Sequence, residues 1–158
     1  KTDISSFCDI DTYKGERLHL IVSRVSPKSV GLIEAIMWNV FCLGRCKLYR
    51  MYYNETMVHS SLVARGSFKF TFLRKNDIEI GPCWTNEEYR GRGIYPYMLG
   101  VIIKEEISNG GTAYMIVADD NKSSLKGITK AGFIRTEFNL KRDFLKRYIP
   151  VKNNNEQS

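Results

Sequence analysis

The sequence predicts a mixed α/β (α+β) domain with a twisted, mostly antiparallel sheet of about six to seven strands flanked by three to four helices. Two observations support this fold class. The first half of the chain contains short β-like runs joined by turn residues, whereas the second half alternates strand, turn, helix, strand, helix and strand. The chain has 158 residues and no internal repeat. We therefore expect one domain over 1–152, followed by a disordered polar tail over 153–158.

The predicted elements follow from apolar periodicity and from the turn residues at their ends. Ser26-Pro27 combines a helix N-cap with a Pro at the first helical position, and Gly44 ends the apolar repeat through 30–41. Asn54-Glu55 joins two β-like runs into an antiparallel hairpin. The predicted order is strand 18–25, helix 26–44, strands 47–53 and 57–65, strand Ile78–Thr85, helix 94–108, strand 112–118, helix 121–132, and strands 133–142 and 144–151. Asn121 is the predicted N-cap of the helix 121–132.

Two features in the middle of the chain modify this simple pattern. Gly81-Pro82 interrupts the strand Ile78–Thr85, which predicts a bulge or an edge that splays away from its neighbour. Phe68, Phe70 and Phe72 alternate within the connection 66–76. This alternation fits either a further strand face or a loop that lines a substrate site.

Charge and hydropathy limit the classes of partner. The net charge is +7 and the isoelectric point about 9.3, which favours anionic partners but equally serves solubility. The basic residues are dispersed and match no nucleic-acid-binding motif, so we predict no nucleic-acid partner. The sequence has no apolar run approaching the ~20 residues that a membrane-spanning helix needs.

The four cysteines are Cys8, Cys42, Cys46 and Cys83. They are too few and too scattered for a disulfide scaffold in a chain of this length. Cys42 and Cys46 lie one helical turn apart, but a closed zinc site needs four ligands, so we predict no metal. We expect buried free thiols, which favour a reducing compartment and hence a cytoplasmic location.

A Gly-rich turn, Arg90-Gly91-Arg92-Gly93-Ile94-Tyr95, follows a predicted strand and opens a predicted helix. Glycines let a ligand approach the backbone, and the first amides of a helix point outward as donors toward an anion. The pattern lacks the Gly-Lys-Ser/Thr of a Walker loop. Pro96 occupies the position of the third Gly in a dinucleotide fingerprint. The remaining interpretation is a pyrophosphate site for coenzyme A.

This turn resembles the main motif of the GNAT superfamily of acetyl-CoA-dependent N-acetyltransferases: Arg or Gln, two residues, Gly, one residue, then Gly or Ala. Tyr95 departs from the small residue usual at the last position. Downstream, 121–124 and 130–133 resemble the family's second cofactor motif, with one helix and one strand between the two motifs. The resemblance covers about 45–140.

The resemblance implies acetyl-CoA as co-substrate and no metal. It places the pantetheine arm in a gap between the strand Ile78–Thr85 and the next strand, and the pyrophosphate on the amides of 92–95. The implied cofactor-binding residues are Trp84, Thr85, Arg90, Gly91, Arg92, Gly93, Ile94, Tyr95, Asn121 and Ser124.

The resemblance also suggests catalytic residues. Glu79 is the candidate general base, six residues before Thr85, although a solvated Glu fits the same position. The family often has a Tyr acid where this chain has Ile128. Tyr95 is the candidate substitute, with Tyr97 and Tyr114 as further possibilities, although packing in the core or against the cofactor fits each of them too. We expect a small amine acceptor, with a nucleotide-linked amino sugar as one candidate. The alternatives are acetylation of a protein amine and a catalytically degenerate acetyl-CoA-binding module.

Three further residues or groups have two interpretations each. Trp84 fits either a wall of the cofactor cleft or an ordinary core position. His59, on a predicted strand, is expected at the surface or buried with its hydrogen bonds satisfied rather than acting as a base. The basic run 141–147 fits either a solvated face, which we expect, or a surface that attracts an anionic substrate.

Overall fold

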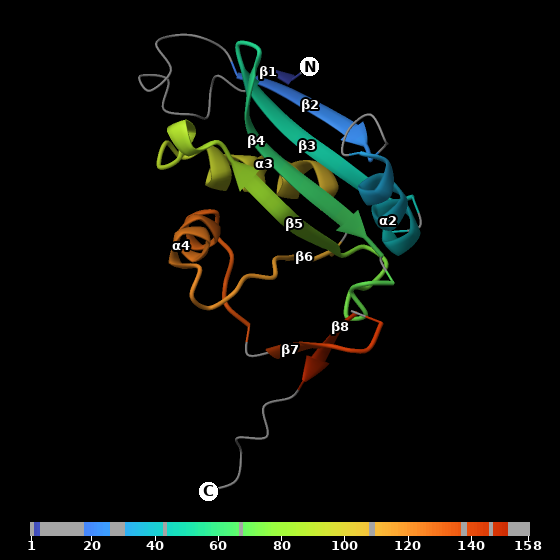
Figure 1. The fold of residues 1–158 in the computed structure, drawn as a ribbon. Helices are drawn as coiled ribbons and strands as arrows, with labels where there is room; N and C mark the ends of the chain where they lie inside the picture. The colour runs from blue at the N-terminus through green and yellow to red at the C-terminus, as the bar shows by residue number, and fades with distance from the viewer. Residues whose placement is uncertain are drawn as a thin grey trace, which may run out of the picture.

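The computed structural model of the chain describes residues 2–3, 18–25, 31–42, 44–66, 68–107, 110–136, 139–145 and 147–151. Its main sheet has six strands in the order β1-β2-β3-β4-β5-β6, and β7 and β8 form a separate two-stranded sheet (Figure 1). All neighbouring strands of the main sheet are antiparallel except β5 and β6, which are parallel. The predicted mixed, mostly antiparallel fold class is confirmed.

The strands and helices follow the predicted order, with two short elements that were not predicted, β1 and η2. The strands are β1 (Thr2–Asp3), β2 (Leu18–Arg24), β3 (Cys46–Tyr53), β4 (Thr56–Arg65), β5 (Ile78–Thr85), β6 (Ala113–Tyr114), β7 (Asn139–Arg142) and β8 (Tyr148–Val151). The helices are α2 (Leu32–Cys42), the 3₁₀ turn η2 (Glu87–Tyr89), α3 (Ile94–Glu106) and α4 (Lys122–Lys130). The β3–β4 hairpin turns at Asn54, which has the left-handed φ of 49°.

Three predicted elements are shorter than expected. Only Ala113–Tyr114 of the predicted strand 112–118 pairs with β5, because the chain then diverges from it. The two C-terminal strands are reduced to Asn139–Arg142 and Tyr148–Val151, and they pair with each other and not with the main sheet. The predicted N-cap at Ser26-Pro27 and the tail 153–158 lie outside the described residues.

The main sheet carries a hydrophobic core on each face. One core packs α3 and Ile128 of α4 against residues of β2 to β5, and the other packs Ala35 and Trp38 of α2 against β3, β4 and Phe70. Ile78 and Ile80 belong to the α3 core. Side chains alternate along a strand, so Glu79 faces the side of α2. This position determines what surrounds the carboxylate.

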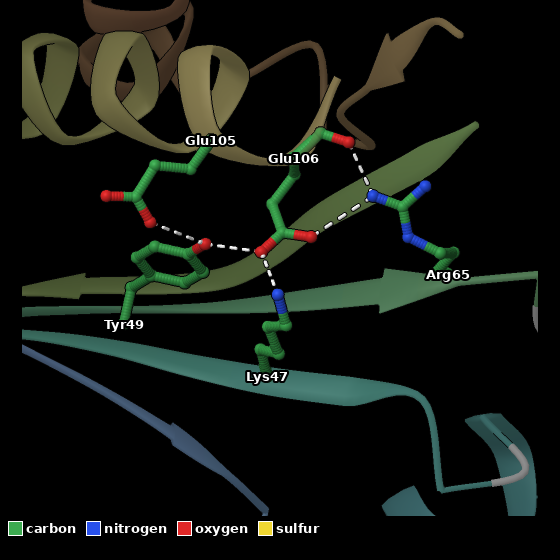
Figure 2. Close-up of polar contacts among 5 residues, drawn as sticks. All are labelled: Lys47, Tyr49, Arg65, Glu105 and Glu106. Atoms are coloured by element: carbon green, nitrogen blue, oxygen red, sulfur yellow. Dashed lines mark hydrogen bonds and ion pairs between the residues drawn. The ribbon is translucent and has the colours of Figure 1, made fainter. Parts of the chain in front are cut away.

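The C-terminal end of α3 is fixed to the sheet by a buried acidic residue. Glu106 is 5% exposed and forms ion pairs with Lys47 on β3, at 2.6 Å, and Arg65 on β4, at 3.1 Å (Figure 2). Tyr49 also donates a hydrogen bond to it. Burial opposes ionisation of Glu106, but these hydrogen bonds outweigh burial and lower its pKa. The helix is therefore held firmly at the end opposite the Gly-rich turn.

In the connection between β4 and β5, the described residues 66 and 68–76 form no strand. Phe70 forms one isolated parallel bridge with Tyr148 of β8 and is buried, whereas Phe68 is half exposed. The Phe70 and Tyr148 rings stack with their centroids 5.5 Å apart. The alternation of phenylalanines therefore does not mark a strand face. It places the ring of Phe70 in the core, in a loop that β8 holds in place.

One cysteine differs from the predicted free thiols. Cys83 is free, as predicted, but Cys46 forms a disulfide, so the prediction of a free thiol is wrong there. A cytoplasmic location, which rested on free thiols, stays a prediction. None of the helices in the described part of the chain is long and apolar enough to cross a membrane.

Candidate active-site cleft

The parallel pair β5–β6 is joined only at its start. Ile78 pairs with Ala113 and Glu79 with Tyr114, and from there 115–118 diverges from β5. A cleft of about 190 Å³ lies in the gap. Its lining comes from β5, the N-terminal turn of α3, the segment 115–118 and α4: Ile80, Gly81, Pro82, Cys83, Tyr95, Met115, Ile116, Val117, Ala118, Asn121, Ser124 and Ile128.

A bulge in β5 shapes one wall of the cleft. Ser61 of β4 pairs with Cys83 and Val63 with Ile80, so Gly81 and Pro82 together oppose the single residue Leu62. The extra residue shifts the alternation of side chains, so that Cys83 packs against the same core as Ile80. The predicted interruption of this strand is confirmed, and it lies where the strands separate.

Glu79 does not itself line the cleft but lies beside it on the α2 side, in the last residue pair before β5 and β6 separate. The side chain is 4% exposed, and burial raises its pKa from 4.5 to about 8, with Lys69 acting in the opposite direction. Its Oε2 has no hydrogen-bond partner among the described residues. A Cβ atom at Gly81 would come within 2.9 Å of Oε1, so the carboxylate lies directly against Gly81, which lines the cleft. The solvated alternative for Glu79 is wrong.

Behind the β5 wall of the cleft, β4 and β5 carry a hydrogen-bonded chain that sequence reasoning did not find and that reaches the cleft only through Cys83. The imidazole of His59 lies between the hydroxyls of Thr85, 2.7 Å from Nδ1, and Ser61, 2.8 Å from Nε2. Ser61 donates to Cys83 Sγ at 3.2 Å. His59 is fully buried, and burial lowers its pKa to about 4, so it stays neutral at physiological pH. Of the two expectations for His59, the buried histidine with both ring nitrogens hydrogen-bonded is confirmed, and the surface position is wrong.

Tyr95 lies in the first turn of α3 and lines the cleft. Its hydroxyl hydrogen-bonds Cys83 and reaches Met115 Sδ at 4.0 Å. Burial, reinforced by Cys83, raises the pKa of Tyr95, so the phenol stays protonated at neutral pH. Burial also raises the pKa of the Cys83 thiol, to about 11, against the hydrogen bond from Ser61. The Tyr95 phenol and the Cys83 thiol therefore line the cleft in their protonated, uncharged forms.

The Gly-rich turn forms the N-terminus of α3. Gly93 is the N-cap with φ 80°, a left-handed conformation that favours glycine, and no side chain caps the helix there. The first amides of the helix thus point out of its end. Arg90 is directed elsewhere: its Nε donates to the carbonyl of Thr85 at 3.2 Å, and it pairs with Glu87. The Arg92 guanidinium lies over the Tyr89 ring, 5.3 Å from the centroid.

Helix α4 closes the far side of the cleft. The side chain of Asn121 accepts from the amide of Ser124 at 3.1 Å and so caps the helix, as predicted, and both residues line the cleft. Ile128 lines it as well, which leaves no proton donor at that position. A Cβ at Gly127 would come within 2.6 Å of the Tyr95 ring, so α4 packs closely on α3 here.

The structure brings together part of the predicted cofactor set. Tyr95, Asn121 and Ser124 line the cleft, and the glycines lie at the adjacent helix N-terminus. Trp84 is 43% exposed, which rules out a core position, and neither it nor Thr85 lines the cleft. His59 and Cys83 could have been suspected only from their polarity within β-like runs, because their contacts join strands far apart in sequence.

No protein-family model and no curated protein matches the sequence. Solved structures do match the fold. A predicted acetyltransferase of Clostridium acetobutylicum with acetyl-CoA is 15% identical, with a TM-score of 0.56, covering 82% of this chain and 98% of that one. A Bacillus subtilis acetyltransferase in complex with CoA is 10% identical, with a TM-score of 0.53, covering 78% of each chain. A possible acetyltransferase of Clostridium difficile is 14% identical, with a TM-score of 0.52, covering 77% and 93%. The chain has the fold of the GNAT acetyltransferases.

Proposed function

We propose that the chain transfers the acetyl group of acetyl-CoA to a primary amine of a small molecule, with a nucleotide-linked amino sugar as one candidate acceptor. The observation that carries the proposal is the cleft between β5 and 115–118, which joins a buried carboxylate to an uncapped helix N-terminus. The fold shared with acetyltransferases solved with acetyl-CoA or CoA supports the same ligand.

In this proposal the cofactor follows the splayed strands. The pantetheine arm lies along β5 between the strands, and the pyrophosphate binds the first amides of α3, where the helix dipole favours an anion. Asn121 and Ser124 contact it from α4. Arg90 already donates a hydrogen bond to the carbonyl of Thr85. Its main role in this proposal is therefore to hold the turn against the end of β5, and the helix amides bind the phosphates.

The chemistry is direct attack of a neutral amine on the thioester carbonyl. Glu79 takes the proton of the amine, directly or through water, and its raised pKa of about 8 suits that task near neutral pH. The new C–N bond forms as the C–S bond breaks, and the thiolate leaves toward Tyr95 and Cys83. These protonated groups can donate hydrogen bonds to the sulfur.

Calorimetric titration with acetyl-CoA, compared with dephospho-CoA and NAD, tests the binding site. We expect saturable binding of acetyl-CoA and none of NAD. Gly93→Asp should abolish that binding without unfolding the protein, because it places a carboxylate at the pyrophosphate site and a side chain at a left-handed φ. Wild-type affinity in a folded Gly93→Asp protein would contradict this position of the cofactor.

A turnover assay that detects the released thiol tests the base. Glu79→Gln should lower kcat roughly 10²-fold or more while leaving acetyl-CoA affinity intact. The wild-type rate should rise with pH and level off above about pH 8, where the carboxylate is ionised. A pH–rate profile that is unchanged in Glu79→Gln would remove Glu79 from the mechanism.

Ile128 favours a second candidate function, a degenerate module that binds acetyl-CoA without turnover. This residue lines the cleft at the position where related enzymes often carry an acid. A screen of amine acceptors, with detection of the released thiol, separates the two functions. A degenerate module binds acetyl-CoA but releases no thiol, whichever amine is added. Turnover with peptides but not with small amines would instead indicate a protein acceptor.

A further inference from the structure

Lys69 occupies an aromatic cage on the α2 side of the sheet. Its Nζ lies 4.5 Å from the centroid of the Trp38 ring, 5.5 Å from that of Phe70 and 5.9 Å from that of Tyr148. Trp38 comes from α2, Phe70 from the connection between β4 and β5, and Tyr148 from β8. Three segments distant in sequence thus place aromatic rings around one lysine amine and partly shield it from water.

The backbone around Lys69 is held in place. The amide of Tyr148 donates to the Lys69 carbonyl at 2.7 Å, and the amide of Thr71 donates to the Tyr148 carbonyl at 3.3 Å. The Phe70 and Tyr148 rings are stacked, with an interplanar angle of 17°. Because β8 fixes this loop, the direction of the Lys69 side chain is set by the fold.

The candidate base faces the same side. Glu79 points away from α3, and it interacts electrostatically with Lys69. Burial lowers the pKa of Lys69, Glu79 opposes that change, and Arg142, whose guanidinium lies 4.9 Å from the Tyr148 ring centroid, adds to it. More of this amine is therefore in the reactive neutral form than for an exposed lysine.

The cleft also reaches this side of the sheet. Gly81 lines the cleft and lies against Glu79 Oε1. Ile116 lines the cleft from the opposite strand and packs against the same core as Trp38 and Phe70. Gly81 and Ile116 therefore connect the cleft with the side of the sheet that carries Glu79 and the caged lysine.

We propose that Lys69 is a self-acetylation site, whose amine accepts the acetyl group from acetyl-CoA bound in the cleft of the same molecule. The inference rests on the proposed acetyl transfer and adds an acceptor built into the chain. Lys69 Nζ attacks the thioester carbonyl, the C–N bond forms as the C–S bond breaks, and CoA leaves as thiolate. Glu79 takes the proton that the amine loses and can return it to the thiolate through solvent.

Acetylation would also modify the base. The positive charge of Lys69 lowers the pKa of Glu79, and an amide at Lys69 carries no charge. The acetylated protein therefore holds the proton on Glu79 to higher pH. The pH–rate profile for an external amine should shift to higher pH after acetylation, and Lys69→Gln should reproduce that shift whereas Lys69→Arg should not.

The experiment incubates the purified full chain with acetyl-CoA and maps the products by mass spectrometry after trypsin digestion. Trypsin does not cleave at acetyl-lysine, so modification at Lys69 yields peptide 66–74 with one added acetyl group. We expect the fraction of Lys69 acetylated per unit time to be independent of protein concentration. It should be absent with CoA in place of acetyl-CoA, absent in Lys69→Arg, and retained in Lys75→Arg, an exposed lysine of the same connection.

Three results would overturn the inference. Calorimetric binding of acetyl-CoA without acetyl-Lys69 would refute self-acetylation and leave the proposed function intact. Modification of Lys69 no faster than that of Lys75 would show unassisted chemical acetylation, and a rate proportional to protein concentration would show transfer between molecules. Absence of acetyl-CoA binding would overturn the proposed function and this inference together.

Discussion

The two ends of the β5–β6 pair differ sharply. At the closed end, Asp77 is 2% exposed and accepts backbone hydrogen bonds from Thr112, at 2.9 Å, and Arg74, also at 2.9 Å. Gly111 lies so close to Asn76 that a Cβ atom would be 2.2 Å from its carbonyl oxygen. At the open end, beyond Glu79, the strands separate and side chains line a cleft.

The comparison shows that one strand pair both fixes two strands of the sheet and forms a cleft. Backbone contacts at the closed end fix the position of both strands, and the bulge at Gly81-Pro82 ends the pairing at a defined residue. The cleft is consequently a product of the fold and not of a flexible loop. Three substitutions test this division, from the largest expected effect to the smallest.

Gly111→Ala should break the closed end. The added methyl would collide with the carbonyl of Asn76, a backbone atom that cannot turn away, so the strands must separate. We expect the free energy of unfolding, measured by urea denaturation, to fall by roughly 3 kcal/mol. Gly100→Ala is the matched control, because a Cβ there meets nothing within 4 Å and the site is helical. It should be neutral or stabilising by about 0.5–1 kcal/mol. Equal stability of the two variants would contradict the tight closed end.

Glu79→Gln should change the pH dependence of stability. The folded-state pKa of about 8 lies above the ordinary 4.5, so this group stabilises the wild type most below pH 4.5. That contribution is lost as pH rises toward 8, because the unfolded carboxyl ionises first. Above pH 8 the variant should be more stable than the wild type by an amount on the order of a few kcal/mol. Glu88→Gln, at an exposed carboxyl, should keep the wild-type profile. Parallel profiles for the Glu79→Gln variant and the wild type would show that Glu79 is solvated.

Gly127→Ala should narrow the open end. Its Cβ would lie 2.6 Å from the Tyr95 ring, so either the ring moves into the cleft or α4 moves away. We expect acetyl-CoA affinity, measured by calorimetry, to fall about tenfold, or about 1.4 kcal/mol, with little loss of stability. Thr129→Ala, at an exposed site on the same helix, serves as control. Wild-type affinity in Gly127→Ala would mean that Tyr95 does not bound the ligand.

Local signals predicted much of the fold and part of the site. The Asn54 turn, the Asn121 cap and the break at Gly81-Pro82 are correct because each depends on the conformational preferences of one or two residues. The strand 112–118 was wrong in extent, since an apolar run does not reveal whether a partner strand stays beside it. The C-terminal strands were predicted too long for a similar reason, because they form their own two-stranded sheet and do not join the main one.

The sequence by itself determined the order of elements, the Gly-rich helix start and the position of Glu79 on β5, since these follow from periodicity and from local backbone preferences. Only the tertiary structure decided that Glu79 is buried where the charge of Lys69 affects its pKa. It also decided that His59 and Ser61 support Cys83, and that Glu106 holds α3 to the sheet. Each of these contacts joins segments that fold together from distant parts of the chain. Burial and the electric field of distant charges set the pKa values of such groups, and no local sequence pattern encodes either.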